Sequence, residues 1–216
     1  MTGGPTSDAP VAGRVHHTRR ATPADVGALV EVLGRAFDDD PVACFLLPDE
    51  ERRRRGLRRF FAIQLRRMYL PRGEVWTTSE LSGAALWGTP AMGRPGLRDL
   101  WMLAPMLRYL AGLGRALPRA GQLLAEIDRA RPRQPHWYLA TLGTDPPRQG
   151  SGVGSSVLAP VLAGLDEEGL PGYLESSKER NLAFYRRHRF EVLREVRLPG
   201  APTIWTMWRE PRPPGS

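Results

Sequence analysis

The chain has 216 residues, of which 41% are hydrophobic, and its formal net charge is +8. This length and apolar content are enough to bury one core, so we expect a single domain. No run of about 18 uninterrupted apolar residues is present that could span a membrane, and the N-terminus lacks the apolar stretch of a secretion signal. We therefore expect a cytoplasmic protein with no membrane partner.

The positive charge lies almost entirely on arginine, with Lys178 as the single lysine. A basic surface can bind nucleic acid, but the densest run, Arg52 to Arg55, is typical of the solvated face of a helix. Basic charge beside a polyphosphate ligand is a second interpretation. Neither requires nucleic acid, so we do not expect it as a partner. The single cysteine, Cys44, excludes an internal disulfide and a cysteine-based metal cluster.

The first part of the chain predicts two helices between polar ends. Residues 1–18 and 211–216 lack periodicity and are expected to be disordered tails, which leaves a domain at 19–210. Thr22 and Pro23 are typical of a helix start, and this helix is expected to end at the acidic turn Asp38 to Pro41. A second helix is predicted from near Pro48, with apolar side chains inward and arginines outward.

The remaining elements alternate. Two strands, 74–79 and 83–88, are expected to pair as a hairpin. The segment 97–131 has helical periodicity interrupted by proline and glycine, which predicts two or three helical pieces that pack on the core or line a pocket. A strand at 137–144, a helix at 152–168, a strand at 172–176 and a helix at 180–188 follow. Strands 190–197 and 203–209 are expected to pair as a second hairpin. This order indicates an α/β fold around a mixed sheet.

The loop between the strand at 137–144 and the next helix contains Gly150, Gly152 and Gly154. Such a loop lets backbone N–H groups approach an anion, and the helix dipole adds partial positive charge, so phosphate is the natural ligand. A P-loop would need Gly-Lys-Ser/Thr where Gly154 is followed by two serines, and a dinucleotide loop would need a glycine at Val157. A plain strand-to-helix turn is the remaining alternative.

Two stretches in order resemble the GNAT superfamily of acyl-CoA transferases. Residues 142–154, with Gln149 opening the glycine loop, are similar to the Gln/Arg-x-x-Gly-x-Gly/Ala signature, and residues 173–190 are similar to the second GNAT motif. The resemblance is closest to the puromycin N-acetyltransferase type and covers roughly residues 19–210. It implies a mixed, splayed central sheet with helices on both faces and a helical insertion around 97–131.

The resemblance also implies an acetyl-CoA site. The backbone of the strand ending at residues 142–144 would pair with the pantetheine amides as an added strand. The loop and the start of its helix would surround the pyrophosphate, and Asn181 would bind the pantetheine or phosphate arm. The residues expected to bind the co-substrate are Leu142, Gly143, Thr144, Gln149, Gly150, Ser151, Gly152, Val153, Gly154, Ser155 and Asn181.

In the family, a tyrosine at the place of Tyr185 stands near the thioester sulfur. A thiolate has a solution pKa near 8.5 and tyrosine lies near 10, so proton donation from Tyr185 to the leaving sulfur is feasible. The alternative is a core aromatic on an amphipathic helix.

An attacking amine must lose a proton, and a carboxylate is the expected base. Glu175, at a strand end beside the loop, is the first candidate; the alternative is a structural carboxylate that anchors a strand or an arginine. The acidic turn Asp38, Asp39 and Asp40 is the second candidate, and a helix-ending turn is its alternative. His136 and His188 are expected to be surface or satisfied histidines, and no spacing predicts a metal site.

The family usually has glycine before the phenylalanine that opens the next strand, whereas Arg189 precedes Phe190 here. If this position needs a positive φ, arginine costs roughly 1 kcal/mol.

Together these features predict an N-acetyltransferase that moves acetyl from acetyl-CoA to a primary amine of a small molecule, antibiotic-like or metabolite-like. A protein or peptide N-acetyltransferase and a non-catalytic acyl-CoA-binding regulatory module are the alternatives. A homodimer is left open.

Overall fold

The computed structural model describes residues 16–92, 109 and 113–212. Its centre is a seven-stranded sheet in the order β1-β2-β3-β4-β5-β7-β6. The strands are β1 (Thr18–Arg20), β2 (Glu74–Thr78), β3 (Gly83–Gly88), β4 (Trp137–Thr144), β5 (Gly172–Ser176), β6 (Glu191–Val196) and β7 (Ile204–Arg209). Neighbouring strands are antiparallel except β4 and β5. Both predicted hairpins, β2–β3 and β6–β7, are confirmed.

Helices cover both faces of this sheet. They are α1 (Val26–Ala36), α2 (Pro41–Leu46), α3 (Glu50–Ile63), α4 (Leu70–Arg72), α6 (Leu117–Ala130), α7 (Val153–Glu168) and α8 (Leu182–Arg187), and α3 continues into a π-helical segment, η2 (Gln64–Tyr69). None of the helices in the described part is long and apolar enough to cross a membrane.

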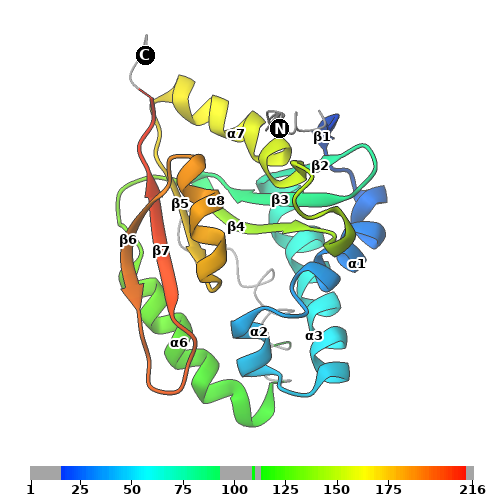
Figure 1. The fold of residues 1–216 in the computed structure, drawn as a ribbon, viewed down its shortest axis with the longest axis vertical. Helices are drawn as coiled ribbons and strands as arrows, with labels where there is room; N and C mark the ends of the chain where they lie inside the picture. Colours follow the sequence, from blue (N-terminus) through cyan, green and yellow to red (C-terminus); the bar gives the residue numbers. More distant parts are fainter. Residues whose placement is uncertain (1–15, 93–108, 110–112, 213–216) are drawn as a thin grey trace, which may run out of the picture.

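Two separate apolar clusters hold the layers together. On one face, Leu29 and Leu33 of α1 and Phe61 of α3 pack on buried side chains of β2 and β3. On the other face, α7 buries Val157, Leu158, Val161, Leu162 and Leu165 in a cluster with buried residues of β3, β4, β5 and β7. This cluster therefore contains strands from both sides of the β4–β5 boundary (Figure 1).

The sheet divides between β4 and β5. The two strands pair only from Trp137 with Gly172 to Leu139 with Leu174, although both continue beyond that point. The division coincides with a bulge in β4, because Leu86 pairs with Thr141 and Trp87 with Leu139, which leaves Ala140 without a partner on β3. A bulge bends its strand and increases the local twist. Figure 1 shows the result: β2–β4 cross the view while β5–β7 run vertically. The predicted splayed, mixed sheet is confirmed.

Helix α6 is the longest element in the described part of the predicted helical insertion, of which residues 97–108 and 110–112 lie outside the described residues. Its buried residues are Ala120 and Leu123. Ala120 belongs to a cluster with Leu47, which follows α2, and Leu123 belongs to a cluster with Val196 of β6. The helix thus lies between α2 and the outer hairpin.

Strand β1 and helix α2 were not predicted from the sequence. Strand β1 begins at Thr18 and pairs with β2. Helix α2 begins directly after the acidic turn, where the side chain of Asp40 accepts hydrogen bonds from the backbone N–H groups of Val42 and Ala43. Asp40 followed by Pro41 is a helix start, and it was interpreted as the end of the preceding helix. The turn therefore has both roles.

The turn after α8 is strained as expected. Arg189 has φ of 67°, in the left-handed region, and its N–H donates to the Arg186 carbonyl at 2.8 Å. In this conformation a residue with a Cβ is roughly 1–2 kcal/mol less stable than in the right-handed helical conformation.

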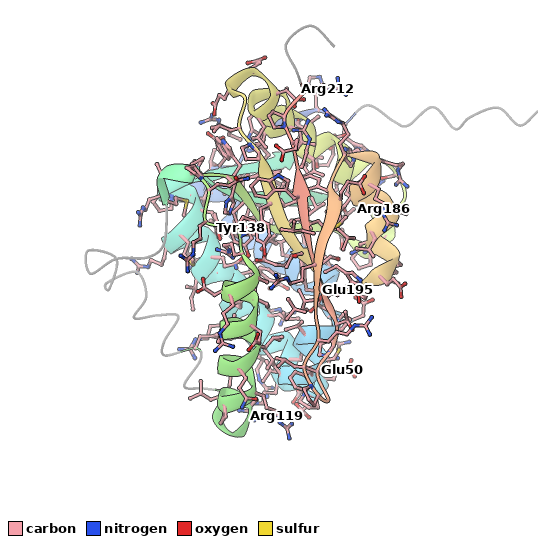
Figure 2. The ribbon with its side chains drawn as sticks, turned by 90° about the vertical axis from the view of Figure 1, so that its left-hand side faces the viewer. Glu50, Arg119, Tyr138, Arg186, Glu195 and Arg212 are labelled. Carbon is pink, nitrogen blue, oxygen red and sulfur yellow. The ribbon has the colours of Figure 1, made fainter. Side chains whose placement is uncertain are left out.

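We predict that Arg189→Gly raises the free energy of unfolding by about 0.5–1 kcal/mol, since glycine removes the strain but gains freedom in the unfolded chain. Arg186→Gly, on the solvent side of α8 (Figure 2), is the matched control and should lower it by about 1 kcal/mol. Urea unfolding of both variants measures the difference. Equal signs for the two substitutions would contradict the assignment of strain to Arg189.

Candidate active site

The glycine-rich loop presents an uncapped helix end. Gly150 and Gly152 adopt φ of 77° and 93°, conformations that favour glycine. Gly152 is the N-cap of α7, and no side chain makes a capping hydrogen bond there. The first N–H groups of a helix have no intrahelical partner, and together with the helix dipole they attract an anion. The local structure has the features that the sequence predicted for a phosphate site.

A cleft of about 390 Å³ opens between this loop, the free end of β4, the end of β5 and α8. It gathers all the residues expected at the co-substrate site except one. Those in its lining are Leu142, Gly143, Thr144, Gln149, Gly150, Gly152, Val153, Gly154, Ser155 and Asn181. Both predicted catalytic residues, Tyr185 and Glu175, also line the cleft. The two sequence stretches therefore meet in one cavity.

Ser151 is the exception. Its hydroxyl donates to the Arg148 carbonyl at 2.7 Å, and its carbonyl accepts from Nε2 of His16 at 2.9 Å. The side chain is held by the loop itself, outside the residues that line the cleft.

The wall formed by β4 depends on a glycine. A Cβ at Gly143 would lie 2.6 Å from Cδ2 of Leu33 and 3.3 Å from Cβ of Ala36, so α1 packs directly on the strand backbone. On the same strand, the buried hydroxyl of Thr141 donates to Oε1 of Gln64 at 2.8 Å. Gln64 begins the π-helical segment, a feature frequent at functional sites. The bond joins this segment to β4 where the sheet divides, and no sequence pattern predicted it.

Tyr185 reaches the cleft from α8 and is 7% exposed. Burial raises the pKa of its phenol, and the negative charge of Asp40 raises the pKa further. The group therefore stays protonated at neutral pH and can donate a hydrogen bond into the cleft. It packs against Phe184 and Phe190 as well, so both sequence interpretations, core aromatic and cleft residue, describe its surroundings.

Glu175 faces the cleft, but its charge is engaged. Its Oε1 accepts a hydrogen bond of 3.1 Å from Nη2 of Arg131, the residue that ends α6. The Arg131 guanidinium lies 4.1 Å from the ring centroid of Tyr138 on β4, and Figure 2 shows Tyr138 at the end of α6 opposite to Arg119. This arrangement matches the alternative of a carboxylate that anchors an arginine.

The three aspartates of the acidic turn point to three different partners. Asp38 forms ion pairs with Arg53 and Arg54 of α3. Asp39 forms ion pairs with Lys178 and Arg180 beyond β5; burial opposes its charged form, but these cations outweigh it and hold the pKa of Asp39 below its usual range.

Asp40 alone of the three lines the cleft, where its Oδ2 accepts a hydrogen bond from the hydroxyl of Ser177. The acidic turn thus contributes one carboxylate to the site.

Four cationic residues that were not assigned to the site also line it: Arg148, Lys178, Arg180 and Arg187. Lys178 and Arg180 are paired with Asp39. Arg148 directly precedes the glycine loop, and Arg187 ends α8. The concentration of arginine in the chain hid the three arginines, because no pattern distinguished them from surface arginines.

The histidines are satisfied, as expected. His136 forms a hydrogen bond with the Gln134 carbonyl at 2.7 Å, and Nε2 of His188 lies 3.0 Å from Oγ of Ser155. Within the described residues, no three His, Cys, Asp or Glu side chains gather in a way that could hold a metal ion.

Comparison with known proteins shows which folds this chain resembles. No family model matches the chain. An uncharacterized N-acetyltransferase of Schizosaccharomyces pombe is 29% identical over 195 residues, which cover 83% of this chain and 76% of the relative. A Corynebacterium glutamicum structure, described as histone acetyltransferase HPA2 and related acetyltransferase, is 25% identical with a TM-score of 0.66 and covers 94% of this chain and 99% of its own. The chain has the GNAT acetyltransferase fold.

The likeness extends across the GNAT fold. Arylalkylamine N-acetyltransferase 2 from Aedes aegypti superposes with a TM-score of 0.59 at 10% identity, covering 91% of this chain and 99% of its own. The relative and these structural neighbours are acetyltransferases, and the assignment of the chain to the acyltransferase enzymes is confirmed at that level. The puromycin type within the family stays a prediction.

We predict that Gly150→Ala lowers the free energy of unfolding by about 1 kcal/mol, because no atom lies within 4 Å of the added Cβ and the positive φ is the sole source of strain. Gly164→Ala, with equally open space inside α7, is the matched control. It should raise the free energy of unfolding by up to about 1 kcal/mol. Calorimetric unfolding measures both variants; a stabilised Gly150→Ala variant would contradict the assigned loop strain.

Proposed function

We propose that the protein transfers an acetyl group from acetyl-CoA to the primary amine of a small molecule, by direct attack in the cleft. The single observation that carries this proposal is that the glycine loop, the unpaired end of β4 and Tyr185 line one cavity. None of these three features alone identifies an acetyl-CoA site. Together they provide an anion site, a strand edge for an amide-bearing chain, and a proton donor.

The residues present fit acetyl-CoA at two points. The uncapped end of α7 offers N–H groups of Val153, Gly154 and Ser155 to a pyrophosphate, with Arg148 nearby in the same lining. Beyond Leu139, β4 has no strand partner on the β5 side, so its backbone groups are free to bind pantetheine amides by strand addition. When bound, the co-substrate supplies a thioester whose carbonyl carbon an amine can attack.

Tyr185 is the proposed general acid. It is buried, and its raised pKa keeps the phenol protonated, so it can donate a hydrogen bond to a sulfur that gains negative charge. The same burial makes it a weaker acid in isolation. A thiolate formed in these surroundings is also poorly solvated and holds a proton more tightly, which restores the direction of transfer from oxygen to sulfur.

Asp40 and Glu175 are the two carboxylates of the cleft, and we assign them different roles toward the amine. Arg131 balances the charge of Glu175, whereas Asp40 is the cleft carboxylate without an ion-pair partner among the described residues. We propose that Asp40 attracts the cationic amine. Glu175, the base candidate from the sequence, takes the amine proton directly or through water.

The surroundings of α6 support a small acceptor. The helix packs beside Leu47 through Ala120 and on the outer hairpin through Leu123, and we propose that it encloses the acceptor side of the site. A closed site suits a small molecule better than a peptide, which needs an open groove.

We predict that Tyr185→Phe lowers kcat about 10²- to 10³-fold and leaves the Kd of acetyl-CoA unchanged, because the hydroxyl acts on the leaving group. In the wild type, the raised pKa of Tyr185 means that loss of its proton does not reduce the rate below about pH 10. Thiol release from acetyl-CoA against a panel of amines, puromycin included, measures both. Full activity of the phenylalanine variant would remove the general-acid role.

We predict that Asp40→Asn raises KM for a cationic amine about tenfold without changing KM for acetyl-CoA, since asparagine still caps α2 but loses the charge. Glu175→Gln is the comparison: it should lower kcat if Glu175 is the base, and lower only stability if it serves Arg131 alone. An unchanged amine KM in Asp40→Asn would contradict the role of Asp40.

The same assay separates the alternatives. Turnover of peptides but of no small amine would favour a protein N-acetyltransferase, a class represented by name among the structural neighbours. Acetyl-CoA binding with no turnover on any amine would favour a non-catalytic regulatory module.

A further inference from the structure

Ser155 and His188 form a hydrogen-bonded pair directly after the glycine loop. Ser155 lies in the first turn of α7 and lines the cleft, and its Oγ is 3.0 Å from Nε2 of His188, which follows α8. Catalysis as described above uses neither the histidine nor this hydrogen bond. We infer, on the basis of the proposed function, that His188 is a positioning residue that turns the hydroxyl hydrogen of Ser155 toward the pyrophosphate of acyl-CoA.

The direction of the Ser155–His188 hydrogen bond decides whether the serine hydroxyl can donate a hydrogen bond to an anion. If Nε2 carries the ring proton, it donates to Oγ, and the hydroxyl hydrogen is free to donate elsewhere. If Nε2 lacks the proton, the hydroxyl donates to it and presents only lone pairs to the cleft. Phosphate oxygens accept hydrogen bonds and do not donate them. Anion binding at the α7 end therefore selects the form in which Nε2 bears the hydrogen.

The ring of His188 is held in place for this role. Its backbone N–H donates to the Tyr185 carbonyl at 2.9 Å, and its carbonyl accepts from Nε of Arg209 at 3.2 Å. The ring packs on Phe184 with centroids 4.8 Å apart. Phe184 in turn lies 3.2 Å from the position of a Cβ on Gly154, so the glycine lets α8 approach the first turn of α7.

Burial and the nearby positive charges both favour the neutral ring of His188. Burial lowers its pKa, and the positive charges of Arg187 and Arg209 lower it further. Arg189 is the next residue, and Asp166 of α7 is paired with Arg209. A neutral ring carries one N–H proton, on either Nδ1 or Nε2. In the free protein both tautomers are available, and the group that Ser155 contacts selects between them.

The test compares variants by acetyl-CoA titration of the full chain. His188→Phe keeps a ring on Phe184 and removes the donor; His188→Gln places an amide N–H at similar reach; Ser155→Ala removes the hydroxyl. We expect His188→Phe and Ser155→Ala each to weaken binding about tenfold, the size of one hydrogen bond to a charged group. His188→Gln should bind within about twofold of wild type, and the double variant His188→Phe/Ser155→Ala no more weakly than Ser155→Ala.

Two further readouts distinguish positioning from a structural role. With acetyl-pantetheine, which lacks the pyrophosphate, KM should be the same in wild type and His188→Phe, and kcat with acetyl-CoA should not change. In the wild type, the ¹⁵N resonance of His188 Nε2 should move to the protonated-nitrogen position when CoA is added. This last measurement does not depend on the folding of any variant.

The outcomes separate the inference from the function on which it rests. Equal CoA affinity in wild type and His188→Phe, additive losses in the double variant, equal losses with acetyl-pantetheine, or an unprotonated Nε2 in the CoA complex would each overturn the role of His188 alone. Failure of the wild type to bind CoA at all would overturn the proposed function and this inference with it.

Discussion

The end of pairing between β4 and β5 is the constraint on which the rest of the site depends. The two parallel strands share hydrogen bonds only as far as Leu139 and Leu174, and the bulge at Ala140 turns β4 away from its neighbour. An unpaired strand interior is costly unless something satisfies its polar backbone groups. In this protein the gap opens onto the cleft, so the unsatisfied edge is open to the strand addition that we propose for the co-substrate.

The divided sheet needs ties across the division, and these ties surround the site. Helix α7 packs on residues from both halves, including Trp87 of β3 and Met207 of β7. Arg131 joins α6 to Glu175 at the end of β5. Asp39 joins the turn before α2 to Lys178 and Arg180. The charged residues that line the cleft thus also hold its walls together, which explains why several of them already have partners.

Sequence periodicity and loop chemistry predicted much of this arrangement. The bounds of β4 and β5 agreed with the predicted strands, because their apolar runs end at clear turn residues. The glycine that the resembling family has at the place of Arg189 pointed to the positive φ found there. The glycines of the loop indicated an anion site with a plain strand-to-helix turn as the alternative, and the second motif favoured the anion site.

Features that depend on tertiary contacts could not be predicted in this way. The sequence does not say that Asp38, Asp39 and Asp40 would face three different partners, since adjacent side chains diverge according to what packs around them. It gave Glu175 as a base without revealing Arg131, which lies 44 residues away in the chain. Asp40 followed by Pro41 is a local pattern for a helix start, but the sequence analysis assigns it to the end of the preceding helix.

The proposed function requires that the open edge of β4 and the end of α7 hold acyl-CoA. Hydrogen exchange of the backbone amides, measured with and without acetyl-CoA, reports on this binding residue by residue. We predict slower exchange confined to residues 140–144 and 150–156 when acetyl-CoA is present, because the N–H groups of these segments that lack a partner gain an acceptor. Unchanged exchange in both segments at a saturating concentration, or protection at a different edge of the sheet, would contradict it.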